Sequence, residues 1–303
     1  MLYAKTTPAE KRKLFRERLA TGELLQLPGA FNPLSAKLIQ EKGFDGVYIS
    51  GAVLAADLGL PDIGLTTLTE VAARSQQISR MTDLPSLVDA DTGFGEPLNL
   101  ARTVQTLEDA GVAGIHIEDQ VNPKRCGHLD GKAVVDEDTA VKRIASAVDA
   151  RRDKNLLIMA RTDIRGVENL AAAIDRAKRL VDAGADAIFP EAMKDLSEFE
   201  AMRKAVTVPI LANMTEFGKS ELFTKQQLAD IGINIVIYPV SLLRLAMGAA
   251  MRGLDALSHD GNLQNVVPEM QTRAELYELL DYEAYNQFDS GIFNFNLDSH
   301  IKH

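Results

Sequence analysis

The sequence predicts an α/β fold, a closed (β/α)8 barrel of the TIM type, from three observations. Short apolar segments rich in β-branched residues alternate eight times with longer segments whose apolar residues recur every three or four positions. The alternation continues from residue 24 to residue 240 with no change of composition between the two halves, which favours closure over an open doubly wound sheet. The chain has 303 residues, 46% of them apolar and 25% charged, which is enough for one such barrel.

Each predicted strand is a short apolar run, the pattern of a parallel strand that is buried on both faces. The segments between the strands, such as 97–111 and 169–185, have helical periodicity and reach a glycine where the helix is expected to end. In chain order the predicted strands are 24–31, 45–52, 84–91, 113–120, 156–163, 186–192, 208–214 and 235–240.

Two flanks lie outside the repeated unit. The N-terminal flank, 1–23, contains a predicted helix from Pro8 to Ala20, and the C-terminal flank, 255–303, has helical periodicity between Pro268 and Gln287. Both are too short to be independent domains, so we treat 1–303 as a single barrel domain. Each flank could either cover one end of the barrel or contact a neighbouring subunit.

The amino-acid composition limits which binding partners and which cellular compartment we expect for this protein. Acidic residues outnumber basic residues by 43 to 33, and a net charge of −10 repels nucleic acid and anionic membranes, so we expect neither as a partner. The single cysteine, Cys126, excludes an intrachain disulfide and a multi-thiolate metal site, as is typical of a reducing compartment. With no secretory signal pattern and no apolar run near the roughly 18 residues of a membrane span, we expect a cytoplasmic protein.

Polar side chains gather where the predicted strands end. In a barrel these ends converge on one mouth, where the active site of this architecture lies. Seven strands contribute, which argues against coincidental helix caps, although His116 taken alone fits a buried core histidine as well as a ligand. The residues are Tyr48, Ser50, Asp89, Asp91, His116, Glu118, Asp119, Arg161, Asp163, Glu191, Asn213, Thr215 and Tyr238.

Asp89 and Asp91 are the clearest indication of a metal ion. Residues two apart on a strand point to the same side, and two carboxylates in one place repel each other unless a cation lies between them. Oxygen ligands without histidine or cysteine indicate a hard ion, Mg²⁺ or Mn²⁺. We expect Asp62 and Glu118 to orient water molecules that the ion retains, with helix capping or a solvated acid as the alternative for each.

Cys126 lies in the basic run KRCGH at 124–128, whose cations favour a thiolate. A thiol in this setting can exchange a proton during catalysis, and the polar, glycine-containing surroundings argue against a buried structural cysteine. The same run and Arg161, Arg244 and Arg273 are candidates for binding substrate carboxylates, although solvated side chains are the default for the last two.

Together these groups suit carbon–carbon cleavage of a small 2-hydroxy acid. A base removes the hydroxyl proton, the bond breaks, and an acid protonates the carbanion that remains. Cys126 fits the role of this acid.

Six motifs spread over nearly the whole chain carry a resemblance to a known family. They are VDADTGFG at 88–95, IEDQ at 117–120, KRCGH at 124–128, MARTD at 159–163, FPEA at 189–192 and ANMTEFG at 212–218. In this order they resemble the isocitrate lyase and phosphoenolpyruvate mutase superfamily. The resemblance implies a (β/α)8 barrel whose last helix packs on a neighbouring subunit, in a homotetramer. It also implies magnesium-dependent cleavage of 2-methylisocitrate to pyruvate and succinate in the methylcitrate cycle of propionate catabolism.

The resemblance also implies roles for single residues. Asp89 and Asp91 hold magnesium, directly or through water, Cys126 protonates the succinate carbanion, and Tyr48 is a candidate base. The family often has SGG where this chain has SGA, so the methyl group of Ala52 would crowd the pocket slightly. The residues expected to contact substrate are Ser50, Gly51, Ala52, Gly127, Arg161, Glu191, Asn213, Thr215, Arg244 and Arg273.

The choice of substrate stays open at this point. Phe189, Ile237 and Pro239 suit an apolar niche for the extra methyl group of 2-methylisocitrate, but burying one methyl group discriminates by only about 1–3 kcal/mol. Isocitrate and 2,3-dimethylmalate are therefore alternative substrates. A non-catalytic barrel that serves as a scaffold is an alternative of another class, against which the joint presence of the aspartate pair, the cysteine and the arginines argues.

Overall fold

The computed structural model describes residues 3–125, 127, 131–218 and 220–293. Within them, each of the eight predicted strands is present inside its predicted range, and every strand pair is parallel. The strands are β1 (Leu25–Pro28), β2 (Val47–Ile49), β3 (Ser86–Asp89), β4 (Gly114–Glu118), β5 (Leu157–Thr162), β6 (Ala187–Pro190), β7 (Leu211–Asn213) and β8 (Ile235–Tyr238).

The strands form a closed barrel. Ladders join β2 to β6 in sequence order and join β1, β8 and β7, and the two groups meet through parallel bridges at Gly29–Tyr48 and Ile188–Ile210. The predicted fold class is thereby confirmed. The surrounding helices are α2 (Pro33–Glu41), α3 (Gly51–Asp57), α4 (Leu68–Ser79), α5 (Leu98–Asp109), α6 (Glu137–Ala150), α7 (Ile164–Val167), α8 (Leu170–Asp182), α9 (Leu196–Ala205) and α10 (Lys225–Asp230).

Side chains fill the barrel in two layers because successive strand residues point to opposite faces. In β2, Tyr48 belongs to the interior cluster, whereas Val47 and Ile49 belong to the layer between strands and helices. The interior cluster also holds Leu87 and Phe189, which are fully buried. The barrel interior is therefore a packed core, and any pocket must lie at one of its ends.

The N-terminal helix α1 (Pro8–Ala20) covers the end of the barrel where the strands begin. Thr7 and Glu10 form a capping box at its start. Phe15, fully buried, packs in the interior cluster with Leu25 and Leu157, the first residues of β1 and β5. This placement decides between the two uses that the sequence left open for this flank.

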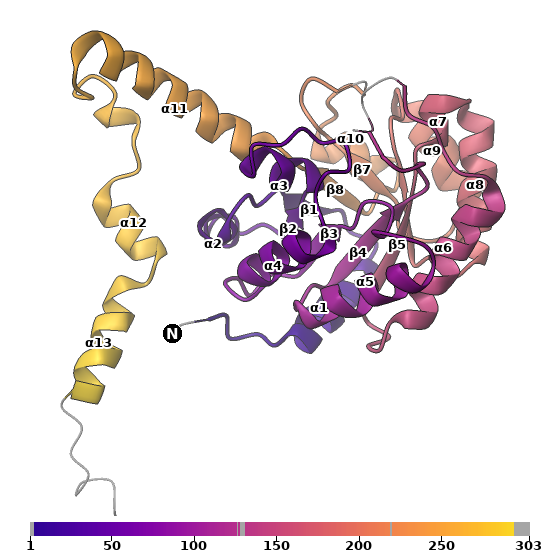
Figure 1. The fold of residues 1–303 in the computed structure, drawn as a ribbon, viewed down its shortest axis with the longest axis horizontal. Helices are drawn as coiled ribbons and strands as arrows, with labels where there is room; N and C mark the ends of the chain where they lie inside the picture. The colour runs from indigo at the N-terminus through magenta and orange to yellow at the C-terminus, as the bar shows by residue number, and fades with distance from the viewer. Residues whose placement is uncertain (1–2, 126, 128–130, 219, 294–303) are drawn as a thin grey trace, which may run out of the picture.

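The C-terminal helices stand away from the barrel. Figure 1 shows α11 (Ser241–Asp260) projecting from the body and α12 (Arg273–Leu279) and α13 (Tyr282–Phe293) running back beside it as a separate column. None of the residues in α11, α12 and α13 is buried, and the predicted flank boundary at 255 lies inside α11. The short turn η1 (Val267–Glu269) connects α11 to α12. Within the described ranges, every helix is too short or too polar to cross a lipid bilayer.

Candidate active site at the carboxyl ends of the strands

A pocket of about 220 Å³ lies where the strands end, and it collects most of the predicted site residues. Gly51, Asp91 and Glu118 adjoin it through contacts with its lining. The lining residues are Tyr48, Ser50, Ala52, Asp62, Asp89, Lys124, Gly127, Arg161, Glu191, Asn213, Thr215, Glu216, Phe217, Gly218, Pro239, Val240 and Arg244.

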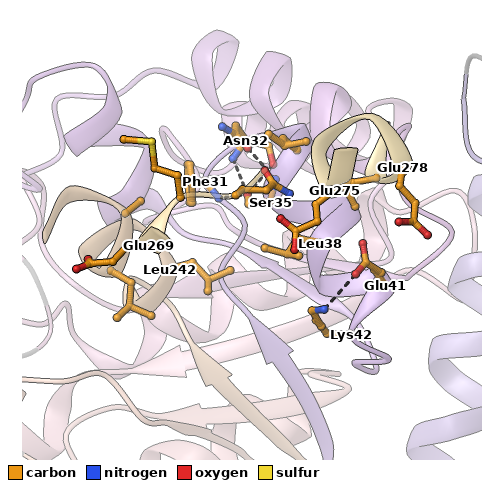
Figure 2. A pocket seen from close by; sticks show the side chains of 16 residues that line it. Phe31, Asn32, Ser35, Leu38, Glu41, Lys42, Leu242, Glu269, Glu275 and Glu278 are labelled. Carbon is orange, nitrogen blue, oxygen red and sulfur yellow. Dashed lines mark hydrogen bonds and ion pairs between the residues drawn. The ribbon is translucent and has the colours of Figure 1, made fainter. Parts of the chain in front are cut away.

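A larger cavity of about 650 Å³ lies elsewhere, between α2, the start of α11 and the segment from η1 to α12. Figure 2 shows Leu38 and Leu242 on its wall and the acidic residues Glu41, Glu269 and Glu275 around it. None of the predicted site residues that the structure describes lines it. The smaller pocket is therefore the candidate active site.

Asp89 and Asp91 lie beside the first residue of α3, where the chain comes very close to both carboxylates. A Cβ atom on Gly51 would lie 3.0 Å from Asp89 Oδ2 and 3.3 Å from Asp91 Oδ1, so only glycine leaves this space open. Ser50 caps α3 by accepting a hydrogen bond from the Val53 amide, which fixes the start of the helix. Both carboxylates therefore lie against the same residue of α3, although Asp89 lines the small pocket and Asp91 lines a separate cavity beside Gly64 and Thr92.

Lys124 brings a cation to these carboxylates. Its Nζ atom lies 2.8 Å from Asp91 Oδ1 and also pairs with Asp62. Burial raises the pKa of Asp91 to about 6, and the Asp89 carboxylate adds to this shift although Lys124 opposes it. From the sequence, Lys124 was expected only as one of the cations near Cys126. Its ion pairs with Asp62 and Asp91 were missed, and its place in the KRCGH run was the one signal that could have indicated them.

The donor set fits a hard divalent cation. Asp91 is nine-tenths buried or more, and burial also raises the pKa of Glu118 well above its usual value, so both carboxylates lack full compensation for their charge. Among the described residues, neither oxygen of Glu118 has a hydrogen-bond partner, although Arg161 Nε lies 3.4 Å from Oε2. In the part of the chain that the structure describes, no three acidic, histidine or cysteine side chains gather into a complete site, so water and substrate would fill the remaining positions.

Tyr48 contacts His116, which the sequence left between a core residue and a ligand. The Tyr48 hydroxyl lies 2.7 Å from His116 Nε2, and the two rings stack with centroids 5.8 Å apart. Burial lowers the pKa of His116 to about 4, so the imidazole is neutral near pH 7. Burial also raises the pKa of Tyr48 well above its usual value. This direction opposes the role of a base, because the hydroxyl keeps its proton.

Arg161 lies on the floor of the pocket in a network of acids. Its Nε atom is 2.9 Å from Asp163 Oδ2 and 3.4 Å from Glu118 Oε2, and its Nη2 atom is 3.5 Å from Glu191 Oε2. The guanidinium carbon lies 5.0 Å from the centre of the Phe189 ring. These contacts fix the guanidinium group while one face remains on the pocket.

Arg244, at the start of α11, is a second cation in the lining of this pocket. Its Nη1 atom lies 3.2 Å from Thr215 Oγ1 and 3.0 Å from Glu216 Oε2. Asn213, also in the lining, donates from its Nδ2 atom to Glu191 Oε2 at 3.3 Å. The pocket thus contains two cations that neighbouring groups hold in place, an arrangement suited to a ligand with more than one carboxylate.

Some predicted residues lie elsewhere. Arg273 is exposed at the first position of α12 and does not line this pocket. Of the three apolar residues expected around a substrate methyl group, Pro239 lines the pocket, whereas Phe189 and Ile237 belong to the barrel interior because their strand positions point inward. Cys126 lies outside the described residues, but its neighbour Gly127 lines the pocket.

Comparisons with known proteins agree with this geometry. A family model described as phosphoenolpyruvate phosphomutase matches residues 15–258. A protein of Corynebacterium glutamicum named probable 2-methylisocitrate lyase 2 is 61% identical over 97% of this chain and 95% of its own length.

Two solved structures have the same fold. A 2,3-dimethylmalate lyase superposes with a TM-score of 0.88 at 32% identity, covering 97% of this chain and 99% of its own. A phosphonopyruvate hydrolase in complex with oxalate and Mg²⁺ superposes with a TM-score of 0.84 at 29% identity, covering 92% and 98%. The family match, the extent of the identity and the barrel together establish that this chain belongs to the phosphoenolpyruvate mutase family.

Proposed function

We propose that this protein cleaves 2-methylisocitrate into pyruvate and succinate in the methylcitrate cycle, in the cytoplasm. Relatives named for this activity match nearly the whole chain, the first of them at 61% identity. The observation that carries the proposal is that Gly127, next to Cys126 in the sequence, lines the same pocket as Asp89 and Arg161. On this proposal, an acid from the KRCGH run and the carboxylates at the end of β3 would serve one site.

Asp89 and Asp91 would hold Mg²⁺, with Mn²⁺ as the second choice, and Asp62 and Glu118 would orient its water molecules. The support is the close approach of Gly51 to both carboxylates and the all-oxygen donor set. When bound, such an ion stabilises negative charge that develops on substrate oxygens. The relative crystallised with oxalate and Mg²⁺ is consistent with this choice.

The chain's own residues then bind, orient and protonate the substrate. Arg161 and Arg244, which both line the pocket, would each bind a carboxylate, with polar support from nearby side chains and from backbone amides at the start of α3. Cys126 would give its proton to the carbanion of the departing succinate. Tyr48 would orient the substrate through its protonated hydroxyl. The supporting polar groups are Ser50, Gly51, Ala52, Gly127, Glu191, Asn213 and Thr215.

We also propose a homotetramer in which α11 packs on a neighbouring subunit and Arg273 reaches the pocket of that neighbour. The support is that α11 exposes Leu245, Met251 and Leu254 without burying any residue, while Arg273 lies outside its own pocket. Exposed apolar surface of this extent is typical of subunit interfaces.

Subunit mixing tests this arrangement. Arg273→Ala and Cys126→Ser, each inactive alone, should recover about a quarter of wild-type activity after unfolding and refolding together. About half of the dimers that form are mixed, and each mixed dimer contains one intact site and one site that lacks both groups. Mixing without recovery would place Arg273 outside any shared site. Size-exclusion chromatography with light scattering measures the tetramer itself.

Pyruvate release from 2-methylisocitrate, with isocitrate and 2,3-dimethylmalate in parallel, tests the reaction. We expect 2-methylisocitrate to give the highest kcat/KM and a chelator to abolish turnover until Mg²⁺ is restored. Preference for either other acid would move the assignment to that substrate. Absence of turnover with all three would leave the scaffold alternative.

A further inference from the structure

Lys132 is a buried cation for which the proposed mechanism has no role. Its side chain is only 3% exposed, and its Nζ atom lies 2.8 Å from Asp163 Oδ1. The same ammonium group donates a hydrogen bond to the backbone carbonyl of Gly127. Lys132 therefore connects the residue that follows β5 to the residue that follows Cys126 in the sequence.

These contacts form a closed ring with the substrate-facing arginine. Asp163 Oδ1 accepts from Arg161 Nη2 at 3.3 Å in addition to Lys132, and Asp163 Oδ2 accepts from Arg161 Nε at 2.9 Å. Gly127 closes the ring by packing directly on Arg161, since a Cβ atom at residue 127 would lie 2.5 Å from Arg161 Nη2. In such a ring each group is held by two neighbours, which restricts its position more than a single contact does.

Gly166, in α7, provides the room that Lys132 occupies. A Cβ atom at residue 166 would lie 2.9 Å from Lys132 Cε and 3.0 Å from Nζ. Adding a methyl group there would displace the lysine tip without changing any charge. The chain thus offers two independent ways to disturb the same ring.

We propose that Lys132 is a positioning residue, which holds the backbone of Gly127 beside Arg161 and thereby restrains the residue that precedes Gly127 in the sequence, Cys126. The inference rests on the proposed function, in which Cys126 gives a proton to the substrate carbanion. Asp163 and Arg161 stay paired when Lys132 is lost, because their two contacts do not involve the lysine. Substrate binding should therefore persist while proton transfer suffers.

The test compares Lys132→Met and Gly166→Ala with the matched controls Lys178→Met and Gly291→Ala. Lys178 is exposed on α8, and a Cβ atom on Gly291 would meet no atom of the described residues within 4 Å. We expect kcat to fall by about tenfold or more in both test variants, since a misplacement near 1 Å can cost about 10²-fold. KM should stay within about threefold, because the Arg161–Asp163 pair remains. Both controls should behave as wild type.

The rate at which Cys126 is alkylated is a second measurement, and it should not change if Lys132 only stabilises the fold. Since Cys126 is the single cysteine, labelling by iodoacetamide reports on it alone. We expect pyruvate and succinate together to protect wild-type Cys126, and the two test variants to lose most of this protection while they remain folded at the labelling temperature.

Each outcome decides the question. Unchanged kcat in both test variants, or a rise in KM that accounts for the whole loss of kcat/KM, would overturn the positioning role. Should Lys132→Met fail to fold, the smaller change in Gly166→Ala decides alone. Wild-type enzyme that releases no pyruvate from 2-methylisocitrate would instead refute the proposed function.

Discussion

Gly127→Ala tests whether the backbone beside Cys126 must pack directly on the pocket floor. The added Cβ atom would lie 2.5 Å from both Arg161 Nη2 and Glu191 Cγ and 2.9 Å from Glu191 Cδ. Ordinary contacts between such atoms are near 3.5 Å, so one partner must move by about 1 Å. Arg161 is held by Asp163 at 2.9 Å, so much of the movement falls on residue 127 and on Glu191.

A displacement of this size near reacting groups costs about 10²-fold in rate. Overpacking also destabilises by about 1–3 kcal/mol. We therefore expect kcat/KM for pyruvate release to fall by about 10²-fold while the protein remains folded at the assay temperature. Gly291→Ala, whose added Cβ atom meets none of the described residues, is the matched control and should keep full activity. Near-wild-type turnover in Gly127→Ala would refute the close packing of this backbone on Arg161.

Three further predictions concern other groups. Cys126→Ser should bind Mg²⁺ and substrate normally but lose about 10²-fold or more in kcat, and unchanged turnover would remove the thiol from the mechanism. Asp89→Ala should abolish the rise in melting temperature that Mg²⁺ gives the wild type, because it removes one of the two carboxylates proposed to hold the ion, and an undiminished rise would place the ion elsewhere. Burial lowers the pKa of Lys11 to about 8 from 10.5, so the unfolded chain binds more protons between these values and stability rises with pH through this window. Wild type should gain up to about 3 kcal/mol of unfolding free energy from pH 7.5 to 10.5 relative to Lys11→Met in urea titrations, and parallel curves would contradict the shift.

The strands and the N-terminal helix were predictable because local sequence and tertiary environment agree for them. Parallel barrel strands are buried on both faces, so they appear as apolar runs whatever their order in the sheet. For α1, Thr7 at the cap and Pro8 at the first position mark the start, and the structure has the predicted bounds, Pro8–Ala20. The path of α11 to α13 was not predictable, because apolar periodicity does not say whether a helix packs on its own barrel.

The site was predictable where strand ends decide position. Asp89, Arg161 and Asn213 line one pocket because parallel strands all end at the same mouth. Arg273 was expected to contact substrate because of the family resemblance. Its distance from the pocket depends on the direction in which the C-terminal helices run. The inward direction of Phe189 depends on the register of β6, which a short apolar run does not specify. The ion pairs of Lys124 likewise depend on how the segment after β4 folds back.

Because α1 covers the end of the barrel where the strands begin, the pocket opens to solvent at one end only. Phe15 closes the covered end and side chains fill the interior, so substrate must enter, and both products of its cleavage must leave, through the same opening. On the proposed reaction, the fragment seated deeper has to wait for the outer one. Release is then ordered, and the last fragment to depart should compete with incoming substrate for the emptied enzyme.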